Sequence, residues 1–184
     1  TYNRNEDPLE LVKNQRDIAF VCGMHRSGTS YLAEQLGEMG FQLPITAKIS
    51  SPLNPRGYFE PAAIQETHNS VLKRLGLAWD SKETLLISLL NADRFPETIE
   101  QLKTDLLKEF PSEKPIVLKD PRLCLLLPIW QRLVKNLGVN SCYILTFRHP
   151  FAVSKSLERR AEVKKAGKHS HENLCRLWMT YLLE

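Results

Sequence analysis

Long apolar runs are missing from this sequence. No stretch approaches the roughly 18 to 20 consecutive apolar residues that a transmembrane helix requires. Residues 1–7 are polar and lack the apolar core of a secretory signal peptide. We therefore expect a protein without a membrane span, located in the cytoplasm.

Cysteine is scarce, and its spacing excludes two kinds of site. The chain has 4 cysteines, and no two are close enough in sequence for a metal knuckle or a redox pair. Cys22, Cys124 and Cys142 lie in apolar runs. Buried free thiols in a reducing compartment are therefore expected.

Charge of one sign is not in large excess. The sequence has 25 Lys and Arg against 21 Asp and Glu, a net charge of +4. This mild excess does not indicate a nucleic-acid partner, although it fits an anionic ligand. The length of 184 residues, of which 42% are hydrophobic, suits a single globular domain over residues 1–184.

Short apolar runs alternate with segments of helical periodicity. The runs predict three buried strands, at 17–22, 115–118 and 141–147. Apolar spacing, with Pro or Gly at several ends, predicts helices at 29–39, 61–75, 96–110, 122–136 (kinked at Pro128), 150–160 and from 172 onward. The alternation predicts an α/β fold, a parallel sheet flanked by helices on both faces. Ligands of such folds bind beyond the C-terminal ends of the strands.

The loop after the first predicted strand has the spacing of a phosphate-binding loop. Gly23 and Gly28 stand five positions apart, between a strand and a helix. Backbone N–H groups in such a loop, together with the helix N-terminus, attract an anion. Thr29 occupies the position of the Walker lysine, and the cation stands inside the loop at Arg26. ATP hydrolysis is therefore disfavoured, and a glycine-rich turn with an incidental arginine is the simpler alternative.

Two motifs resemble the PAPS-dependent sulfotransferase superfamily, whose donor is 3′-phosphoadenosine 5′-phosphosulfate (PAPS). Arg26-Ser-Gly-Thr-Ser30 resembles its 5′-phosphosulfate loop. Arg148-His-Pro150, with Ser156 eight residues after the arginine, resembles its 3′-phosphate site. The resemblance implies a P-loop nucleoside triphosphate hydrolase-like fold in three α/β/α layers.

A third motif follows the second predicted strand. Lys119-Asp120-Pro121 resembles the tyrosylprotein sulfotransferases, in which the lysine contacts the transferring group. Lys119 would then stabilise charge on the sulfuryl and bridging oxygens. Asp120 could instead hold a metal ion in a P-loop kinase, or both residues could simply cap a helix. Arg122 is a further cation without an assigned role.

A fourth motif, residues 54–60, resembles the Asn-Pro-x-Gly-Tyr-Phe-Glu segment of bacterial sulfotransferase-family proteins. Glu60 is the candidate base that takes the acceptor's proton, with a helix-start glutamate as the alternative. His25 and His68 are reserve candidates for the base. Tyr31 stands where cytosolic sulfotransferases carry an adenine-stacking Trp, and it could equally be a core residue.

The resemblance implies in-line sulfuryl transfer from PAPS, without a required metal, to a hydroxyl or amine. The acceptor is a small molecule, sugar, lipid or peptide, and its identity and the oligomeric state are not readable. Arg26, Lys119 and Glu60 are the catalytic candidates. The candidates for donor binding are Gly23, His25, Arg26, Ser27, Gly28, Thr29, Ser30, Tyr31, Arg148 and Ser156.

Two alternatives remain open at this point, a P-loop kinase and a non-catalytic nucleotide-binding domain. Family members usually continue beyond the 3′-phosphate motif, and no Gly-x-x-Gly segment like that of the cytosolic branch follows this motif here. We therefore expect a domain that lacks C-terminal elements of the full family domain, either as a fragment or as an inactive binder.

Overall fold

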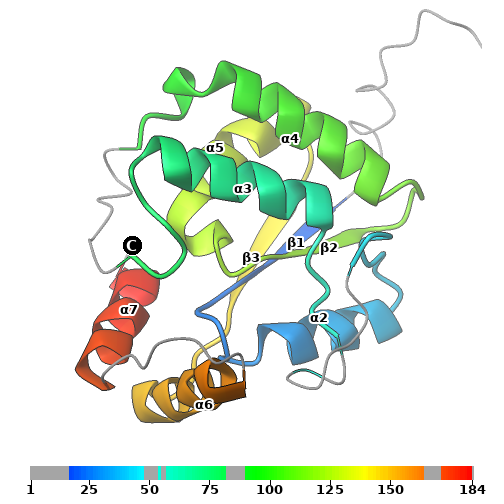
Figure 1. The fold of residues 1–184 in the computed structure, drawn as a ribbon. Coiled ribbons are helices and arrows are strands. Elements are labelled where there is room, and N and C mark those ends of the chain that lie inside the picture. Colours follow the sequence, from blue (N-terminus) through cyan, green and yellow to red (C-terminus); the bar gives the residue numbers. More distant parts are fainter. Residues whose placement is uncertain (1–16, 48–53, 55–56, 82–89, 164–170, 184) are drawn as a thin grey trace, which may run out of the picture.

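The computed structural model describes residues 17–47, 54, 57–81, 90–163 and 171–183. Within these ranges the chain forms an α/β fold around a 3-stranded parallel sheet (Figure 1). The sheet has the order β2-β1-β3, in which β1 (Ile18–Cys22) pairs with β2 (Ile116–Lys119) on one side and with β3 (Ser141–Leu145) on the other. All three strands point the same way, so their C-terminal ends meet at one edge.

The central strand divides the apolar interior into two clusters, because successive side chains of a strand point to opposite faces. On one face, Ala19 and Val21 pack with Ala33 and Leu36 of α2 (Thr29–Glu38). On the other face, Ile18, Phe20 and Cys22 join a larger cluster. That cluster includes residues of α3 (Ala62–Arg74), α4 (Pro96–Glu109) and α5 (Leu123–Leu137).

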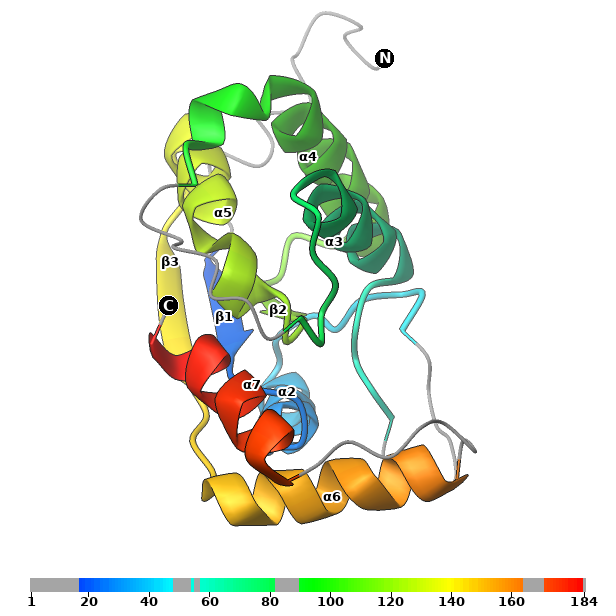
Figure 2. The same ribbon diagram turned by 60° about the vertical axis from the view of Figure 1, so that its left-hand side comes forward.

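The last two helices, α6 (Pro150–Val163) and α7 (His171–Leu183), lie against each other near the C-terminal ends of β1 and β3 (Figures 1 and 2). A short 3₁₀ turn, η2 (Ala92–Arg94), precedes α4. None of the described helices has both the length and the hydrophobicity needed to span a bilayer.

The predicted elements are confirmed within a few residues, but β3 and the helix kink differ from the prediction. The third strand ends at Leu145 and not at Phe147, and it is one of the two outer strands of the described sheet. Tyr143 and Leu145 are 41% and 59% exposed, so the expectation of a sheet covered on both faces is wrong for β3. For the same reason Cys142 is exposed, contrary to the prediction of a buried thiol.

The helix kink is displaced from its predicted place. Pro128 lies inside α5, but the residue with non-helical backbone angles is Leu126. A proline in a helix removes an N–H donor and clashes with the carbonyl four residues earlier. The distortion therefore falls in the turn preceding Pro128.

Candidate functional site

The loop between β1 and α2 is shaped by glycines at both ends. Gly23 has φ 143, and a Cβ there would lie 2.8 Å from the Thr146 carbonyl oxygen. The Ser27 hydroxyl donates to the Met24 carbonyl at 2.6 Å and also contacts the Thr146 hydroxyl. Gly28, with φ 100, precedes the first turn of α2. Gly23 and Ser27 therefore hold the loop, and the first residues of α2 line the pocket at its end.

Two cysteines that are distant in sequence meet behind this loop. The Cys124 sulfur accepts the Gly23 N–H at 3.0 Å and hydrogen-bonds with Cys22. That hydrogen bond and burial raise the pKa of Cys22. Both thiols are buried and free, as predicted.

The two predicted phosphate sites are joined directly. Arg26 has a left-handed backbone (φ 69), and its Nε donates to the Ser156 hydroxyl at 2.8 Å. Arg148 donates from Nη1 to the Arg26 carbonyl at 3.0 Å. Ser154, the other serine of α6 near this position, is buried and bonded to His171 Nδ1 at 2.6 Å. Ser156 is thus the serine that reaches the loop.

The end of β2 carries a buried ion pair. Lys119 Nζ donates to Glu60 Oε1 at 2.6 Å and to the Tyr58 carbonyl at 3.0 Å. The Lys119 and Glu60 side chains are 2% and 11% exposed. Gln65 Nε2 donates to the other Glu60 oxygen at 2.5 Å. Glu60 is therefore oriented from both sides.

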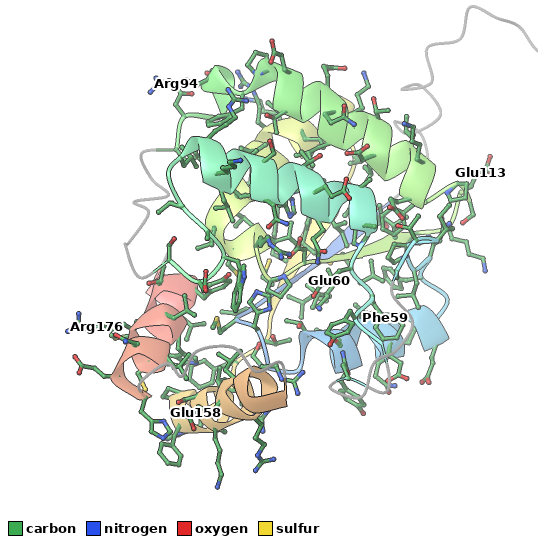
Figure 3. The ribbon with its side chains drawn as sticks, in the orientation of Figure 1. Phe59, Glu60, Arg94, Glu113, Glu158 and Arg176 are labelled. Carbon is green, nitrogen blue, oxygen red and sulfur yellow. The ribbon has the colours of Figure 1, made fainter. Side chains whose placement is uncertain are left out.

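The segment before α3 brings Glu60 to this place. The Asn54 side chain bonds the Ser30 hydroxyl at 3.3 Å and the Gly57 carbonyl, which ties the segment to α2. Phe59 has a left-handed backbone (φ 53) and packs against the apolar cluster beneath α2. Figure 3 shows Phe59 and Glu60 in the region between α2 and α3. Because Phe59 is anchored on that cluster, the neighbouring Glu60 side chain is positioned to contact Lys119.

Asp120 is buried and bonded on both of its oxygens. Oδ2 contacts His68 Nδ1 at 2.8 Å, and Oδ1 accepts from Arg122 Nη1 at 2.9 Å and from the Arg122 backbone N–H at 3.0 Å. Burial by itself raises the pKa of Asp120, but the His68 hydrogen bond and the Arg122 charge outweigh it and hold that pKa well below its usual range. His68 also accepts from Trp130 Nε1 at 2.8 Å. Because His68 is fully buried in these bonds, it is a structural residue and not a candidate base.

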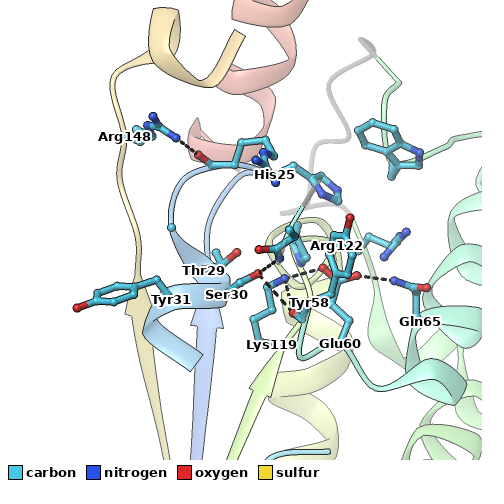
Figure 4. A pocket seen from close by; sticks show the side chains of 15 residues that line it. His25, Thr29, Ser30, Tyr31, Tyr58, Glu60, Gln65, Lys119, Arg122 and Arg148 are labelled. Carbon is cyan, nitrogen blue, oxygen red and sulfur yellow. Dashed lines mark hydrogen bonds and ion pairs between the residues drawn. The ribbon is translucent and has the colours of Figure 1, made fainter. Parts of the chain in front are cut away.

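A pocket of about 320 Å³ opens where the strands end, within the size range of small-ligand sites. Of the residues predicted for the site, those that line it are His25, Arg26, Gly28, Thr29, Ser30, Tyr31, Glu60, Lys119 and Arg148. Gly23, Ser27 and Ser156 do not line the pocket but contact or shape the loop beside it. Figure 4 shows Tyr31 pointing away from Lys119 and Glu60. Since Tyr31 is 57% exposed, the interpretation of it as a core residue is wrong.

Six lining residues were not assigned to the site from sequence: Asn54, Tyr58, Gln65, Trp79, Pro121 and Arg122. Asn54, Tyr58, Pro121 and Arg122 belong to or adjoin motifs that had been singled out, so their position was the available signal. Trp79 and Gln65 carry no such signal. The described ranges contain no cluster of three or more His, Cys, Asp or Glu side chains that could hold a metal ion.

His25 joins the loop to distant parts of the chain. Its ring packs edge-on against Trp79 at a centroid distance of 4.7 Å and against Tyr181 of α7 at 5.9 Å. The pocket therefore combines a helix N-terminus, three cations of the predicted site and one carboxylate, with an aromatic wall. No family model, curated protein or solved structure matches this chain, so its function is inferred from these residues alone.

Proposed function

We propose that the protein is a sulfotransferase with the P-loop sulfotransferase fold, which transfers the sulfuryl group of PAPS to a hydroxyl or amine. One observation carries the proposal. Arg26, Glu60, Lys119 and Arg148 come from four separate motifs, yet all four line one pocket at the C-terminal edge of the sheet. The hydrogen bond from Arg148 Nη1 to the Arg26 carbonyl, at 3.0 Å, holds these two residues side by side, which supports the binding of one bisphosphorylated nucleotide by both.

The residues of the pocket have the chemistry that this transfer needs. The acceptor oxygen or nitrogen attacks sulfur, the bond from sulfur to the bridging phosphate oxygen breaks, and 3′-phosphoadenosine 5′-phosphate (PAP) leaves. Glu60, oriented by Gln65 and Lys119, takes the acceptor's proton. Lys119, Arg26 and the N–H groups at the start of α2 stabilise the negative charge that develops on the leaving oxygen.

The kinase alternative is less well supported. It needs a carboxylate for Mg²⁺, and Asp120 was the candidate. Both Asp120 oxygens are engaged by His68 and Arg122, and the side chain is fully buried. A metal ion at Asp120 would have to displace these partners, and Thr29 still stands in place of the Walker lysine.

Calorimetric titration with PAP in the presence of EDTA tests the proposal. We expect saturable binding without metal, because the phosphates are held by side chains and backbone amides. Arg148→Ala removes a charged hydrogen-bond donor, worth about 1.5–3 kcal/mol, and should weaken PAP binding roughly ten- to hundredfold. Arg159→Ala, on the exposed side of α6, is the matched control and should leave the affinity unchanged. Tighter binding of Mg·ATP than of PAP would contradict the proposal.

A further inference from the structure

Arg122 is the cation that none of the predicted roles explains. It follows Asp120-Pro121 at the start of α5, and its side chain is 9% exposed. Its Nη1 bonds Asp120, but its Nε is buried and has no hydrogen-bond partner among the described residues. A buried charged N–H without an acceptor is costly. Because Arg122 also lines the pocket, a bound ligand is a natural source of the missing acceptor.

A chain of buried hydrogen bonds fixes the orientation of Arg122. Trp130 donates to His68 Nε2, so the His68 proton is on Nδ1 and is donated to Asp120. Asp120 then accepts from both the backbone and the Nη1 of Arg122. Trp130, His68 and Asp120 are each 0% exposed. These three are positioning residues, which keep one side of the guanidinium bonded and leave its Nε side for a ligand.

Arg122 lines the same pocket as Arg148, the candidate for donor binding. In the view of Figure 4, Arg122 is drawn on the opposite side of His25 from Arg148. Trp79 and Pro121 line the same pocket and supply apolar surface. Glu60 would repel an anion here, but its charge is neutralised by Lys119 at 2.6 Å. Arg122 is paired with Asp120 through Nη1, and what remains unsatisfied is its Nε, which has no hydrogen-bond partner among the described residues.

We propose that Arg122 binds an anionic group of the acceptor, a carboxylate or a similar oxyanion carried next to a flat apolar ring. This inference rests on the proposed function, because it assigns PAP to the other end of the pocket. The Nε side of a guanidinium presents N–H donors in a geometry that matches a carboxylate. Glu60 then faces the nucleophile of an acceptor whose orientation Arg122 sets. Arg122 is thereby a specificity-determining residue, which rejects acceptors lacking the anion.

The test compares benzoate with benzamide, which differ in charge and little in shape. Each is titrated into the protein, with and without saturating PAP, while the indole N–H signals are followed by NMR. We expect benzoate to bind at least about tenfold more tightly than benzamide, as a hydrogen bond to a charged group predicts. Arg122→Gln should remove this preference and leave the PAP affinity within about twofold.

A second variant, Arg122→Lys, tests the same inference if Arg122→Gln does not fold. Arg122→Lys keeps the charge but loses the forked donor geometry, so it should also lose most of the preference for benzoate. Arg132→Gln, on α5 and 40% exposed, is the control and should keep the preference for benzoate. Equal affinity for benzoate and benzamide, or no binding of either, overturns the inference. A preference for benzoate that persists in both Arg122 variants also overturns it.

The two proposals fail in different ways in this experiment. A preference for benzoate that depends on Arg122, without PAP binding, would support the anion subsite and contradict the sulfotransferase proposal. PAP binding without a preference for benzoate would support the sulfotransferase proposal and contradict the anion subsite. An Arg122→Gln variant that loses PAP affinity as strongly as Arg148→Ala would place Arg122 in the donor site and overturn the inference.

Discussion

Lys119 and Glu60 form the buried ion pair at the centre of the pocket, and at the residue scale each depends on the other. Removing one partner of a buried pair leaves an uncompensated charge and costs about 3–5 kcal/mol. We therefore expect Lys119→Met and Glu60→Gln each to lower the free energy of unfolding by about that amount. The double variant should lose less free energy of unfolding than the two single variants together, because it contains no unpaired buried charge. Urea unfolding of the four proteins measures the coupling.

The exposed pair between Arg132 and Asp93 is a matched control for this cycle. Exposed ion pairs contribute about 0.2–1 kcal/mol. The same cycle on Arg132 and Asp93 should therefore give a small coupling energy. Additive effects of Lys119→Met and Glu60→Gln would show that the two side chains do not interact in solution.

Asp120 gives a prediction of pH dependence. Its pKa in the folded protein lies well below its usual range, whereas an unfolded aspartate has a pKa of about 3.9. A depressed carboxyl pKa stabilises the fold above the unfolded value, and this stabilisation is lost as the pH falls toward the folded value. Asp120→Asn should thus be destabilised relative to the wild type at pH 7, and the difference should shrink below about pH 4. Urea unfolding at pH 7, 4 and 3 measures it.

Asp93→Asn is the control for this titration, since Asp93 is 61% exposed. The free energy of unfolding of Asp93→Asn should differ little from that of the wild type at each pH. A difference between Asp120→Asn and the wild type that stays constant from pH 7 to pH 3 would mean that Asp120 does not titrate as the structure indicates.

At the scale of elements, the sequence predicts most of what the structure contains. The runs that end at Gly23 and Lys119 are continuous and apolar, and they became β1 and β2, which are buried throughout. The exposure of β3 could not be predicted in this way, because SCYIL is also a short, mostly apolar run. Sheet order alone does not explain the difference, because β2 is also an outer strand and is buried throughout. The outer edge of β2 forms a bridge with Gln42, whereas β3 pairs with β1 alone among the described strands.

The turn from β1 to α2 provides a prediction about this element. A Cβ at Gly23 would meet Thr146, whereas one at Gly28 would have no atom within 4 Å. Gly28→Ala therefore carries only the strain of a positive φ, about 1–2 kcal/mol, and Gly23→Ala carries steric overlap in addition. We expect Gly23→Ala to have the lower melting temperature of the two. The reverse order would contradict the packing described for the loop.

At the scale of the whole molecule, the motifs predicted the pocket only in part. The sequence placed Lys119, Glu60 and Arg148 near the ends of elements, and the parallel sheet brought those ends together. It could not predict Trp79, which carries no motif. Trp79 reaches the pocket through contacts with His25 and Tyr181, 54 residues before it and 102 residues after it in the chain. Such contacts depend on the packing of α7 against the rest of the fold.

Tyr181 is one of the residues through which α7 supports the pocket, and it gives a prediction for the molecule as a whole. Its hydroxyl donates to the Trp79 carbonyl at 2.8 Å, and burial raises its pKa well above the usual value. Tyr181→Phe leaves that carbonyl without its donor and should lower the free energy of unfolding by about 1–3 kcal/mol at pH 7.

The same residue should govern part of the alkaline unfolding. An unfolded tyrosine loses its proton near pH 10, while buried Tyr181 keeps it, so the stability from Tyr181 is present below about pH 10 and falls above it. The slope is at most about 1.4 kcal/mol per pH unit for one group. The Tyr181→Phe variant should therefore lose stability less steeply than the wild type between pH 9.5 and about 11, whereas Tyr143→Phe, at a 41% exposed position, should follow the wild type. Parallel curves for all three proteins would show that Tyr181 is accessible to solvent and that α7 does not seal the wall of the pocket.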